Sequence, residues 1–308
     1  MNVQTGSSNS TSAVAFDVAD AVLKNVITVG LCISIICINS VLVHIFVQHE
    51  TFSLNPRYIL YIHLVINDII VLTMLTLLYM LSYTIFTLNV SLCMVLIILA
   101  ICTNINNPMT LAIMAIECYV AVCFPLHHSR VCTVKKTYII IAFIWLSSLL
   151  TNLPDVFVSL AVESSEFFHL RVFCLRNTVF RHPALPQKRD ISYAVLLVIV
   201  CLTLLYIYCK ILLAAQSAST DVKKARKTIL LHSFQLMLSL LTYLNNVVEA
   251  GLKHLFPNSI VIIRFFITIL ITIIPRLVSP LVYGLRDKMF RKYLKYYFLC
   301  MKNNQIDI

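Results

Sequence analysis

Long apolar stretches separated by short polar connections run along nearly the whole chain. A membrane's hydrocarbon core is roughly 30 Å thick and needs about 20 apolar residues per helix. Stretches of about this length or longer occur at 22–47, 57–82, 92–123, 137–160, 191–214, 228–250 and 259–285. Barrel strands would instead show alternating polarity over roughly ten residues, and 59–81 keeps no such alternation. The pattern predicts an all-α membrane protein with a bundle of seven transmembrane helices over 22–285.

The composition excludes several other classes. The 308 residues are 60% hydrophobic and 12% charged, with a mean hydropathy of +0.90, and a soluble domain of this size could not bury so much apolar surface. The spans show no internal similarity of the kind expected for a transporter with inverted repeats. Neither Gly-x-Ser-x-Gly nor His-Glu-x-x-His occurs, and four glycines provide no glycine-rich phosphate loop. We therefore predict neither an enzyme nor a metal centre.

Basic residues set the predicted orientation. The connections at 48–57, 124–136 and 210–227, together with the tail from Arg286, hold fifteen Lys and Arg, against six in the other connections. Lys and Arg collect on the cytoplasmic side, so residues 1–21 are expected to form an extracellular tail. This tail has no basic and apolar leader, so the first span is expected to act as its own insertion signal. Asn9 begins a glycosylation sequon in the tail; the second sequon, at Asn89, is expected to lie too near the bilayer.

Residues 286–308 are predicted to form a short amphipathic eighth helix and a cytoplasmic tail. Between Arg286 and Lys302, basic residues are interleaved with Phe, Tyr and Leu, as in a helix lying on the inner leaflet. The net charge of +11 is scattered over the connections, so it indicates contacts with anionic membrane lipids and no nucleic acid. Cys300 is a candidate for palmitoylation, and an unmodified thiol is the alternative.

Short motifs follow one another in a fixed order along the chain. Glu117, Cys118 and Tyr119 end the third span and are followed by Pro125-Leu126. Further motif positions are Asn39, Leu54-Asn55-Pro56-Arg57-Tyr58, Leu64, Asp68, Trp145, Lys224-Ala225, Thr228, His232, Ser279-Pro280-Leu281-Val282-Tyr283 and Arg286. In order and spacing they resemble the vertebrate odorant receptors, a branch of the rhodopsin-like G-protein-coupled receptors. The Glu-Cys-Tyr and Ser-Pro variants are more similar to the fish members than to the mammalian ones.

The resemblance implies a function and a set of residues that perform it. A small-molecule odorant would bind in the outer half of the bundle and activate a heterotrimeric G protein of the stimulatory type, raising cAMP, at the plasma membrane of olfactory cilia. It also implies a disulfide between Cys93, at the outer end of the third span, and Cys174 in the external loop 161–190. The residues that it assigns to coupling and activation are Glu117, Cys118, Tyr119, Ala121, His232, Ser279, Pro280 and Tyr283.

Cys118 departs from the rhodopsin-like pattern, in which Arg follows the acidic residue and pairs with it at rest. Glu117 is therefore expected to lack this partner. One alternative is that another basic residue, such as Lys223, Lys224 or Lys227, replaces the arginine. A second is weak signalling or high basal activity, and a third is that Cys118 is a neutral substitution of a subfamily.

Asp68 places a carboxylate in mid-membrane, which is costly without a partner or water. Helix offsets place Asn39, Asn107 and Ser279 near it, and this cluster is expected to hold a sodium ion or a network of water molecules. A purely structural polar contact between helices is the alternative. Pro280, next to Ser279, is expected to bend the seventh helix.

The ligand pocket is predicted by comparison with the family and from helix faces. Ala100 stands where amine receptors carry Asp, and Ile273 where opsins carry the retinal-binding Lys, so neither ligand class is expected. The predicted lining is apolar with a few hydrogen-bonding groups, as suits a small odorant: Ile97, Ala100, Ile101, Asn104, Tyr243, Asn246, Arg264 and Phe265. A rhodopsin-like receptor for a peptide, lipid or nucleotide outside olfaction, or a silent receptor, is the alternative. The odorant's identity and the oligomeric state stay open.

Overall fold

The computed structural model of the protein describes residues 6–84, 87–215, 260–286 and 289–294, together with Leu230, Phe234, Met237 and Leu252. Within these ranges the chain is almost entirely helical. Its α-helices are α1 (Gly6–Gln48), α2 (Glu50–Ser53), α3 (Pro56–Thr84), α4 (Val90–Cys123), α5 (Pro125–Val131), α6 (Val134–Val162), α7 (Arg176–Val179), α8 (Ala184–Ala215), α10 (Ile260–Ile267) and α11 (Ile274–Arg286). A tighter helical turn, η1, spans Ser165–His169, and π-helical turns, η3, span Thr268–Ile273.

Among the residues that the structure describes, five helices are long and apolar enough to cross a membrane: Val22–Gln48 within α1, Pro56–Leu81 within α3, Val90–Cys123, Val134–Val162, and Ala184–Lys210 within α8. They confirm five of the predicted spans. The predicted span 228–250 lies outside the described residues apart from Leu230, Phe234 and Met237. The predicted span 259–285 corresponds to the continuous helix that α10, η3 and α11 form over Ile260–Arg286.

Helical structure extends toward both ends of the chain. α1 begins at Gly6, so it continues through most of the segment that was predicted as an extracellular tail. Residues 289–294, within the predicted eighth helix, are helical, and Phe290 is buried with its ring centre 5.4 Å from that of Phe52. This part of the C-terminal segment therefore packs back onto the bundle. Cys300 lies outside the described residues.

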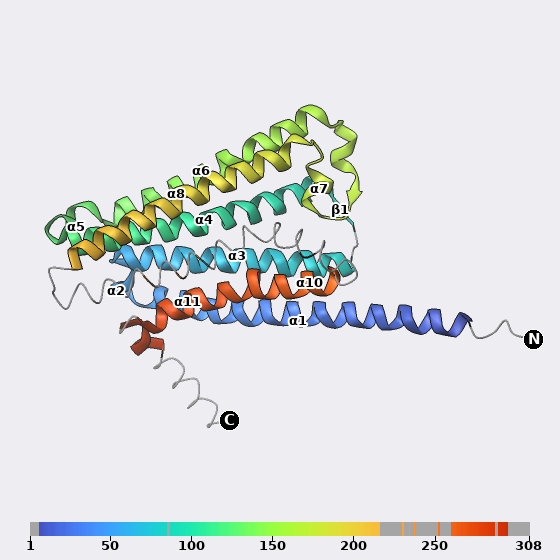
Figure 1. Ribbon diagram of the computed structural model, residues 1–308, viewed down its shortest axis with the longest axis horizontal. Coiled ribbons are helices and arrows are strands. Elements are labelled where there is room, and N and C mark those ends of the chain that lie inside the picture. The colour runs from blue at the N-terminus through green and yellow to red at the C-terminus, as the bar shows by residue number, and fades with distance from the viewer. Residues whose placement is uncertain are drawn as a thin grey trace, which may run out of the picture.

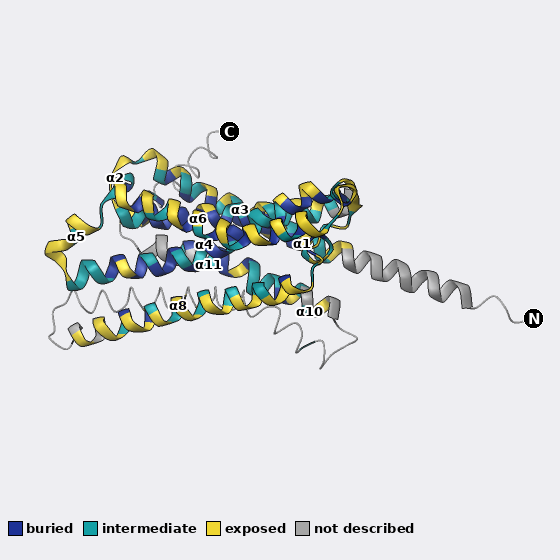
Figure 2. Ribbon diagram, turned by 90° about the horizontal axis from the view of Figure 1, so that it is seen from above, coloured by how far each residue is buried: buried dark blue, intermediate teal, exposed yellow. Residues whose placement is uncertain are grey.

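α4 lies at the centre of the described bundle. It packs against α3, α6 and α8, while α1 packs against α3 and α11 (Figure 1). Buried residues are frequent on α4, whereas the outward faces of α6 and α8 are largely exposed (Figure 2). The exposed side chains there include Leu146, Leu153, Val195 and Leu202. Lipid tails are as apolar as leucine, so these faces suit a bilayer, and the contacts between helices depend on close packing and hydrogen bonds.

Capping groups and prolines mark several helix boundaries. Asn89 caps α4, because its side-chain oxygen accepts a hydrogen bond from the Ser91 amide at 2.9 Å. Pro125 occupies the first turn of α5, where a missing amide hydrogen removes no helical bond. α11 continues through Pro280, whose carbonyl oxygen accepts a hydrogen bond from the Tyr61 hydroxyl at 2.9 Å. The bend expected at Pro280 stays a prediction.

The two ends of the bundle carry different elements. At one end β1 (Leu88–Asn89) pairs antiparallel with β2 (Arg171–Val172), and α7 lies beside them (Figure 1). The predicted disulfide between Cys93 and Cys174 is present there, and this end is called the disulfide end below. α2, α5 and residues 289–294 lie at the opposite end, which is called the Glu117 end after the residue that contacts α5.

Candidate functional site

Glu117 is held by two basic side chains from other elements. It lies near the end of α4, and only 5% of its surface is exposed. Arg57 Nε, from the first turn of α3, lies 2.9 Å from Oε2, and His128 Nε2, from α5, lies 2.9 Å from Oε1. The Asn55 side-chain oxygen accepts a hydrogen bond from the Arg57 amide at 3.1 Å, which fixes the start of α3. The Glu117 carboxylate therefore connects α3, α4 and α5.

The arginine that usually follows the acidic residue is absent, and the structure agrees with the alternative in which another basic residue replaces it, because Arg57 reaches Glu117 from another helix. The predicted substitutes Lys223, Lys224 and Lys227 lie outside the described residues. The sequence did carry a signal for Arg57, which stands where the odorant-receptor motif Leu-His-x-Pro-Met-Tyr has Met. A basic residue gained at the mouth of one span can compensate for a basic residue lost at the mouth of its neighbour.

Cys118 packs on a different helix from the partners of Glu117. It is 3% exposed and lies in a buried cluster with Val200, Leu204 and Ile207 of α8. An arginine at this position would enter the contact between α4 and α8, where nothing among these apolar side chains balances its charge. Cysteine, as a small apolar residue, suits this contact.

The remaining coupling residues are described only in part. Tyr119 and Ala121 are half-buried, and the Tyr119 ring meets the Phe124 ring edge-on at 5.8 Å between centres. Pro280 is buried within α11. His232 and the side chains of Ser279 and Tyr283 lie outside the described residues.

A second ion pair lies in the interior of the bundle. Arg276 Nη1 of α11 lies 2.8 Å from Asp68 Oδ1 of α3, and the two side chains are 6% and 3% exposed. Asn107 donates to the same carboxylate oxygen at 2.8 Å, and Arg276 Nη2 donates to the Asn104 side-chain oxygen at 2.6 Å. The Asn39 amide donates to the Arg276 carbonyl oxygen at 3.4 Å. This network joins α1, α3, α4 and α11.

The structure brings three of the four predicted polar-core residues into this network, and the side chain of the fourth, Ser279, lies outside the description. Sequence reasoning missed Arg276, although an arginine inside an apolar span is itself a signal. Two buried atoms, Asn39 Oδ1 and Asn107 Oδ1, have no hydrogen-bond partner among the described residues. Such atoms are the usual partners of buried water.

A sodium ion at Asp68 stays a prediction. The residues present fit it poorly, because the Arg276 guanidinium already balances the Asp68 carboxylate at 2.8 Å. A second cation at that carboxylate would face the guanidinium at close range in a region of low dielectric constant. The amide oxygens of Asn39 and Asn107 that lack a hydrogen-bond partner favour the other half of the expectation, a network of water molecules.

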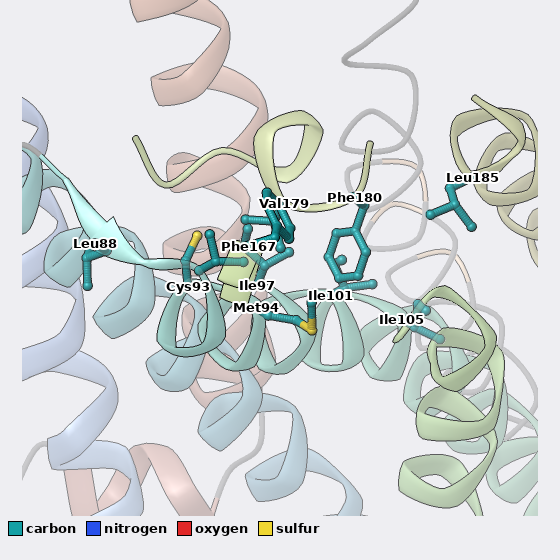
Figure 3. Close-up of a cluster of buried hydrophobic side chains, with 11 residues drawn as sticks. Leu88, Cys93, Met94, Ile97, Ile101, Ile105, Phe167, Val179, Phe180 and Leu185 are labelled. Carbon is teal, nitrogen blue, oxygen red and sulfur yellow. The ribbon is translucent and has the colours of Figure 1, made fainter. Parts of the chain in front are cut away.

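The predicted ligand contacts on α4 divide into two groups. Ile97 and Ile101 are 8% and 9% exposed and lie beneath Phe167, Val179 and Phe180, which point onto α4 from the connection between α6 and α8 (Figure 3). Their side chains therefore contact this connection in the present structure. The disulfide lies at the edge of the same cluster, because Cys93 belongs to it and Cys174 packs against it.

Ala100 and Asn104 form the second group. Both are half-buried, the Asn104 amide donates to the Ala100 carbonyl oxygen at 2.8 Å, and the Asn104 side-chain oxygen binds Arg276. Phe265 of α10 is half-buried and meets Phe266 edge-on at 5.5 Å between ring centres. Tyr243, Asn246 and the side chain of Arg264 lie outside the described residues.

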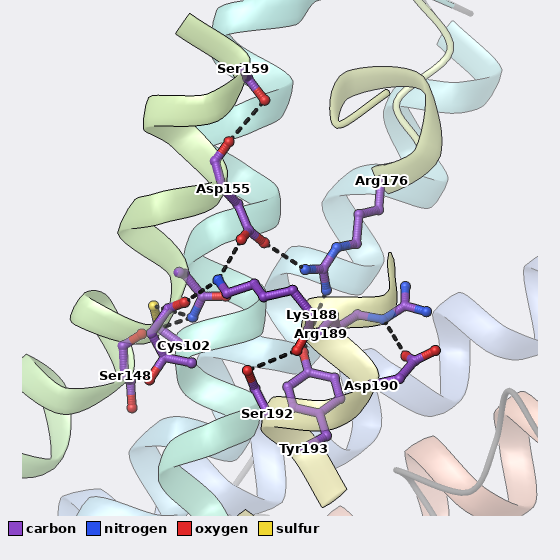
Figure 4. Close-up of polar contacts among 12 residues, drawn as sticks. Cys102, Ser148, Asp155, Ser159, Arg176, Lys188, Arg189, Asp190, Ser192 and Tyr193 are labelled. Atoms are coloured by element: carbon purple, nitrogen blue, oxygen red, sulfur yellow. Dashed lines mark hydrogen bonds and ion pairs between the residues drawn. The ribbon is translucent and has the colours of Figure 1, made fainter. Parts of the chain in front are cut away.

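Sequence reasoning also missed a charged cluster near the disulfide end. Asp155 of α6 is 2% exposed, and its carboxylate pairs with Arg176 Nη2 at 3.1 Å and with Lys188 Nζ (Figure 4). Arg176 begins α7, and Lys188 lies in the first turns of α8. Asp155 is the only acidic residue within 137–160. This lone acidic residue could have revealed the cluster from the sequence, because a carboxylate in an apolar span needs a partner.

The helical fold, with its membrane-spanning helices, agrees with what comparisons with known proteins find. Residues 38–303 match the family described as 7 transmembrane receptor (rhodopsin family). The chain therefore belongs to the rhodopsin family of seven-transmembrane receptors and is a multi-pass protein of the plasma membrane. Members of this family are receptors rather than enzymes.

The chain is also similar to odorant receptor 131-2 of Danio rerio. The two are 34% identical over 212 residues, which is 68% of this chain and 64% of that receptor. The match confirms the resemblance to fish odorant receptors that the motifs indicate.

Proposed function

We propose that this protein is an odorant receptor with seven transmembrane helices, which binds a small molecule in the half nearer the disulfide end and activates a heterotrimeric G protein at the Glu117 end. The observation that carries the proposal is the identity of 34% to an odorant receptor over 68% of the chain. With the N-terminus outside, the disulfide end is extracellular and the Glu117 end is cytoplasmic. The eighth helix then lies on the inner leaflet, and the receptor acts in the cilia of olfactory sensory neurons.

The proposed pocket lies beneath the cap that the disulfide holds on α4. Its lining comprises Ile97, Ala100, Ile101, Asn104, Tyr243, Asn246, Arg264 and Phe265. Asn104 gives this pocket a connection to the rest of the bundle, because it binds Arg276, which in turn binds Asp68. A ligand that displaces Asn104 changes the contacts of α11 with α3 and α4. This is the proposed route from the pocket toward Pro280 and the G-protein side.

At the Glu117 end, the contacts of Glu117 with Arg57 and His128 support a resting state in which α3, α4 and α5 are held together. Activation separates these elements and opens a cavity beneath Tyr119 and Ala121, into which a segment of the G protein inserts. Glu117, Cys118, His232, Ser279, Pro280 and Tyr283 complete the proposed coupling region.

A second candidate is a receptor that couples weakly or not at all. Cys118 favours it, because this side chain is buried against α8 and presents no positive charge to a G protein. A third is a receptor for a peptide, lipid or nucleotide outside olfaction. Transcripts confined to olfactory sensory neurons support the odorant proposal, whereas transcripts spread over many tissues support a receptor outside olfaction.

The decisive experiment expresses the receptor with a stimulatory G protein and measures cAMP against a panel of odorants. We expect at least one odorant to raise cAMP in a concentration-dependent manner. Ala121→Arg should abolish this response without preventing ligand binding, because the bulky charge blocks the coupling cavity. A receptor that reaches the surface, ignores all odorants and responds to a peptide, lipid or nucleotide would refute the odorant function.

A further inference from the structure

The Asp155 cluster, which comprises Asp155, Arg176 and Lys188, carries more positive than negative charge. Within the described part of the chain, neither basic side chain lies within ion-pair distance of a second carboxylate. Arg189, the neighbour of Lys188, pairs with Asp190 instead. The two cations of the cluster therefore share one carboxylate, and one positive charge is left without a counter-charge.

The unbalanced charge is accessible, whereas the carboxylate is not. The Asp155 side chain is 3% exposed, and the side chains of Arg176 and Lys188 are 20% and 33% exposed. Lys188 also donates to the Thr151 carbonyl oxygen, and Arg176 Nη1 lies 3.5 Å from the Tyr193 hydroxyl. These contacts hold both cations in place. A fixed, partly buried charge is costly until an opposite charge reaches it, so the cluster favours an approaching anion.

Buried apolar side chains adjoin Arg176. The guanidinium carbon of Arg176 lies 6.0 Å from the centre of the Phe180 ring. Phe180 belongs to the same buried cluster as Ile97 and Ile101, two of the proposed ligand contacts (Figure 3). Tyr193 packs against this cluster. The positive charge of Arg176 therefore lies beside a buried apolar cluster at the disulfide end. A small molecule that has an anionic group and an alkyl portion would match this combination of charge and hydrocarbon.

We propose that Arg176 and Lys188 form an anion subsite that binds the carboxylate of a small organic acid. The inference rests on the proposed odorant function and specifies the ligand class. A guanidinium offers paired donors that match the two oxygens of a carboxylate, and the ammonium of Lys188 adds a compact charge. Asp155 positions both cations. A neutral alcohol or ester gains no benefit from the excess positive charge.

Lys188→Met tests the subsite, because it leaves Arg176 and Asp155 as a balanced pair. The probes are the straight-chain carboxylic acids from acetic to decanoic acid, each with its matching alcohol and methyl ester. Wild-type receptor should respond to acids at lower concentrations than to the matching neutral probes. Lys188→Met should lower the potency of the acids by roughly tenfold to a hundredfold, as expected for the loss of a charge-assisted hydrogen bond. The potency of the neutral probes should stay nearly unchanged. Lys188→Arg keeps the charge and should retain the response to acids.

Arg189→Met is the matched control. It removes the same charge one residue away, from an ion pair with the exposed Asp190, and should leave the potency of acids unchanged. If Lys188→Met lowers the potency of acids and alcohols equally at matched surface expression, the cluster is structural and the proposal is overturned. A wild-type preference for alcohols over their matching acids overturns it as well.

Thermal unfolding of the purified receptor separates the subsite from the proposed odorant function. An acid that raises the melting temperature of the wild type but not of Lys188→Met supports the subsite even where no probe raises cAMP, and in that case the odorant function alone fails. If neutral probes raise cAMP while no acid stabilises the wild type, the odorant function stands and the subsite is refuted.

Discussion

Arg57 and Glu117, 60 residues apart in the chain, form an ion pair in which Nε and Oε2 are 2.9 Å apart. The acid lies on α4 and the arginine on α3, so the pair joins the ends of two helices. In the rhodopsin-like pattern the arginine follows the acid directly, and here Cys118 occupies that position. The positive charge has moved to a neighbouring helix, which means that separating α3 from α4 breaks the pair.

Arg57→Met should therefore raise basal cAMP at matched surface expression. The Arg57 side chain is 37% exposed, so water screens the pair, and its contribution is about 1 kcal/mol or less. This corresponds to a rise of at most roughly fivefold. Arg130→Met, which removes an exposed arginine from α5, should have no effect. Unchanged basal cAMP in Arg57→Met would show that the pair does not restrain activation.

Cys132, between α5 and α6, should report the charge of Glu117. Burial raises the pKa of the Cys132 thiol, the Glu117 carboxylate raises it further, and Lys136 and Arg57 lower it. A raised pKa leaves less thiolate near neutral pH, so Cys132 should react slowly with iodoacetamide. Glu117→Gln lowers the pKa and should speed alkylation, whereas Arg57→Met raises the pKa and should slow it. Site-resolved mass spectrometry measures both rates, and changes in the same direction for both variants would contradict this account.

Arg276→Met should destabilise the receptor strongly. It leaves the buried Asp68 carboxylate without its cation, and removing one partner of a buried pair typically costs about 3–5 kcal/mol. Asp68→Asn combined with Arg276→Met removes both charges, so the double variant should unfold at a higher temperature than Arg276→Met alone. Melting temperatures of the purified receptor test this. A melting temperature of the double variant equal to or below that of Arg276→Met would show that the pair does not stabilise the receptor through charge balance.

The same pair predicts how the wild type responds to sodium. Because Arg276 already balances Asp68, replacing sodium chloride by choline chloride should leave the melting temperature and agonist affinity unchanged. Arg276→Met frees the carboxylate and should make the receptor's stability depend on sodium. A wild-type receptor that sodium specifically stabilises would establish the expected ion at Asp68 and contradict the proposed role of the guanidinium.

Replacing Cys93 or Cys174 with Ser should reduce folding and delivery to the cell surface. The bridge joins residues 81 positions apart, and the chain-entropy estimate for a loop of this length is about 4–5 kcal/mol. Flow cytometry of surface-tagged receptor measures the loss. Cys37→Ser, which removes an exposed free cysteine, is the control and should reach the surface normally. Recovery of both bridge residues as free thiols from surface receptor would refute the disulfide.

Glycosylation should depend on Asn9 and not on Asn89. The Asn89 side chain caps α4 through the Ser91 amide, and its nitrogen donates to the His169 carbonyl oxygen at 3.5 Å. The nitrogen that would carry a glycan is therefore engaged against the bundle. Asn9→Gln should abolish the gel shift that glycosidase treatment causes, and Asn89→Gln should leave it intact. The opposite pattern would contradict the engagement of the Asn89 side chain against the bundle.

The sequence by itself determined the number of apolar spans, and five of them have the predicted positions in the structure. This was possible because bilayer thickness sets the length of a span whatever its neighbours are. The bridge between Cys93 and Cys174 followed from the family resemblance for a similar reason. It depends on which side of the membrane a cysteine occupies, and the order of spans along the chain decides that.

Only the tertiary structure decided which charges meet. Arg57 reaches Glu117 from 60 residues away, Arg276 reaches Asp68 from 208 residues away, and Asp155 collects its cations from two other elements. Hydropathy does not specify how far each helix is rotated about its own axis, because any rotation keeps the apolar surface in lipid. Packing between helices sets that rotation. The partners of buried charges, on which the proposed coupling and the anion subsite depend, therefore emerge only when the helices are assembled.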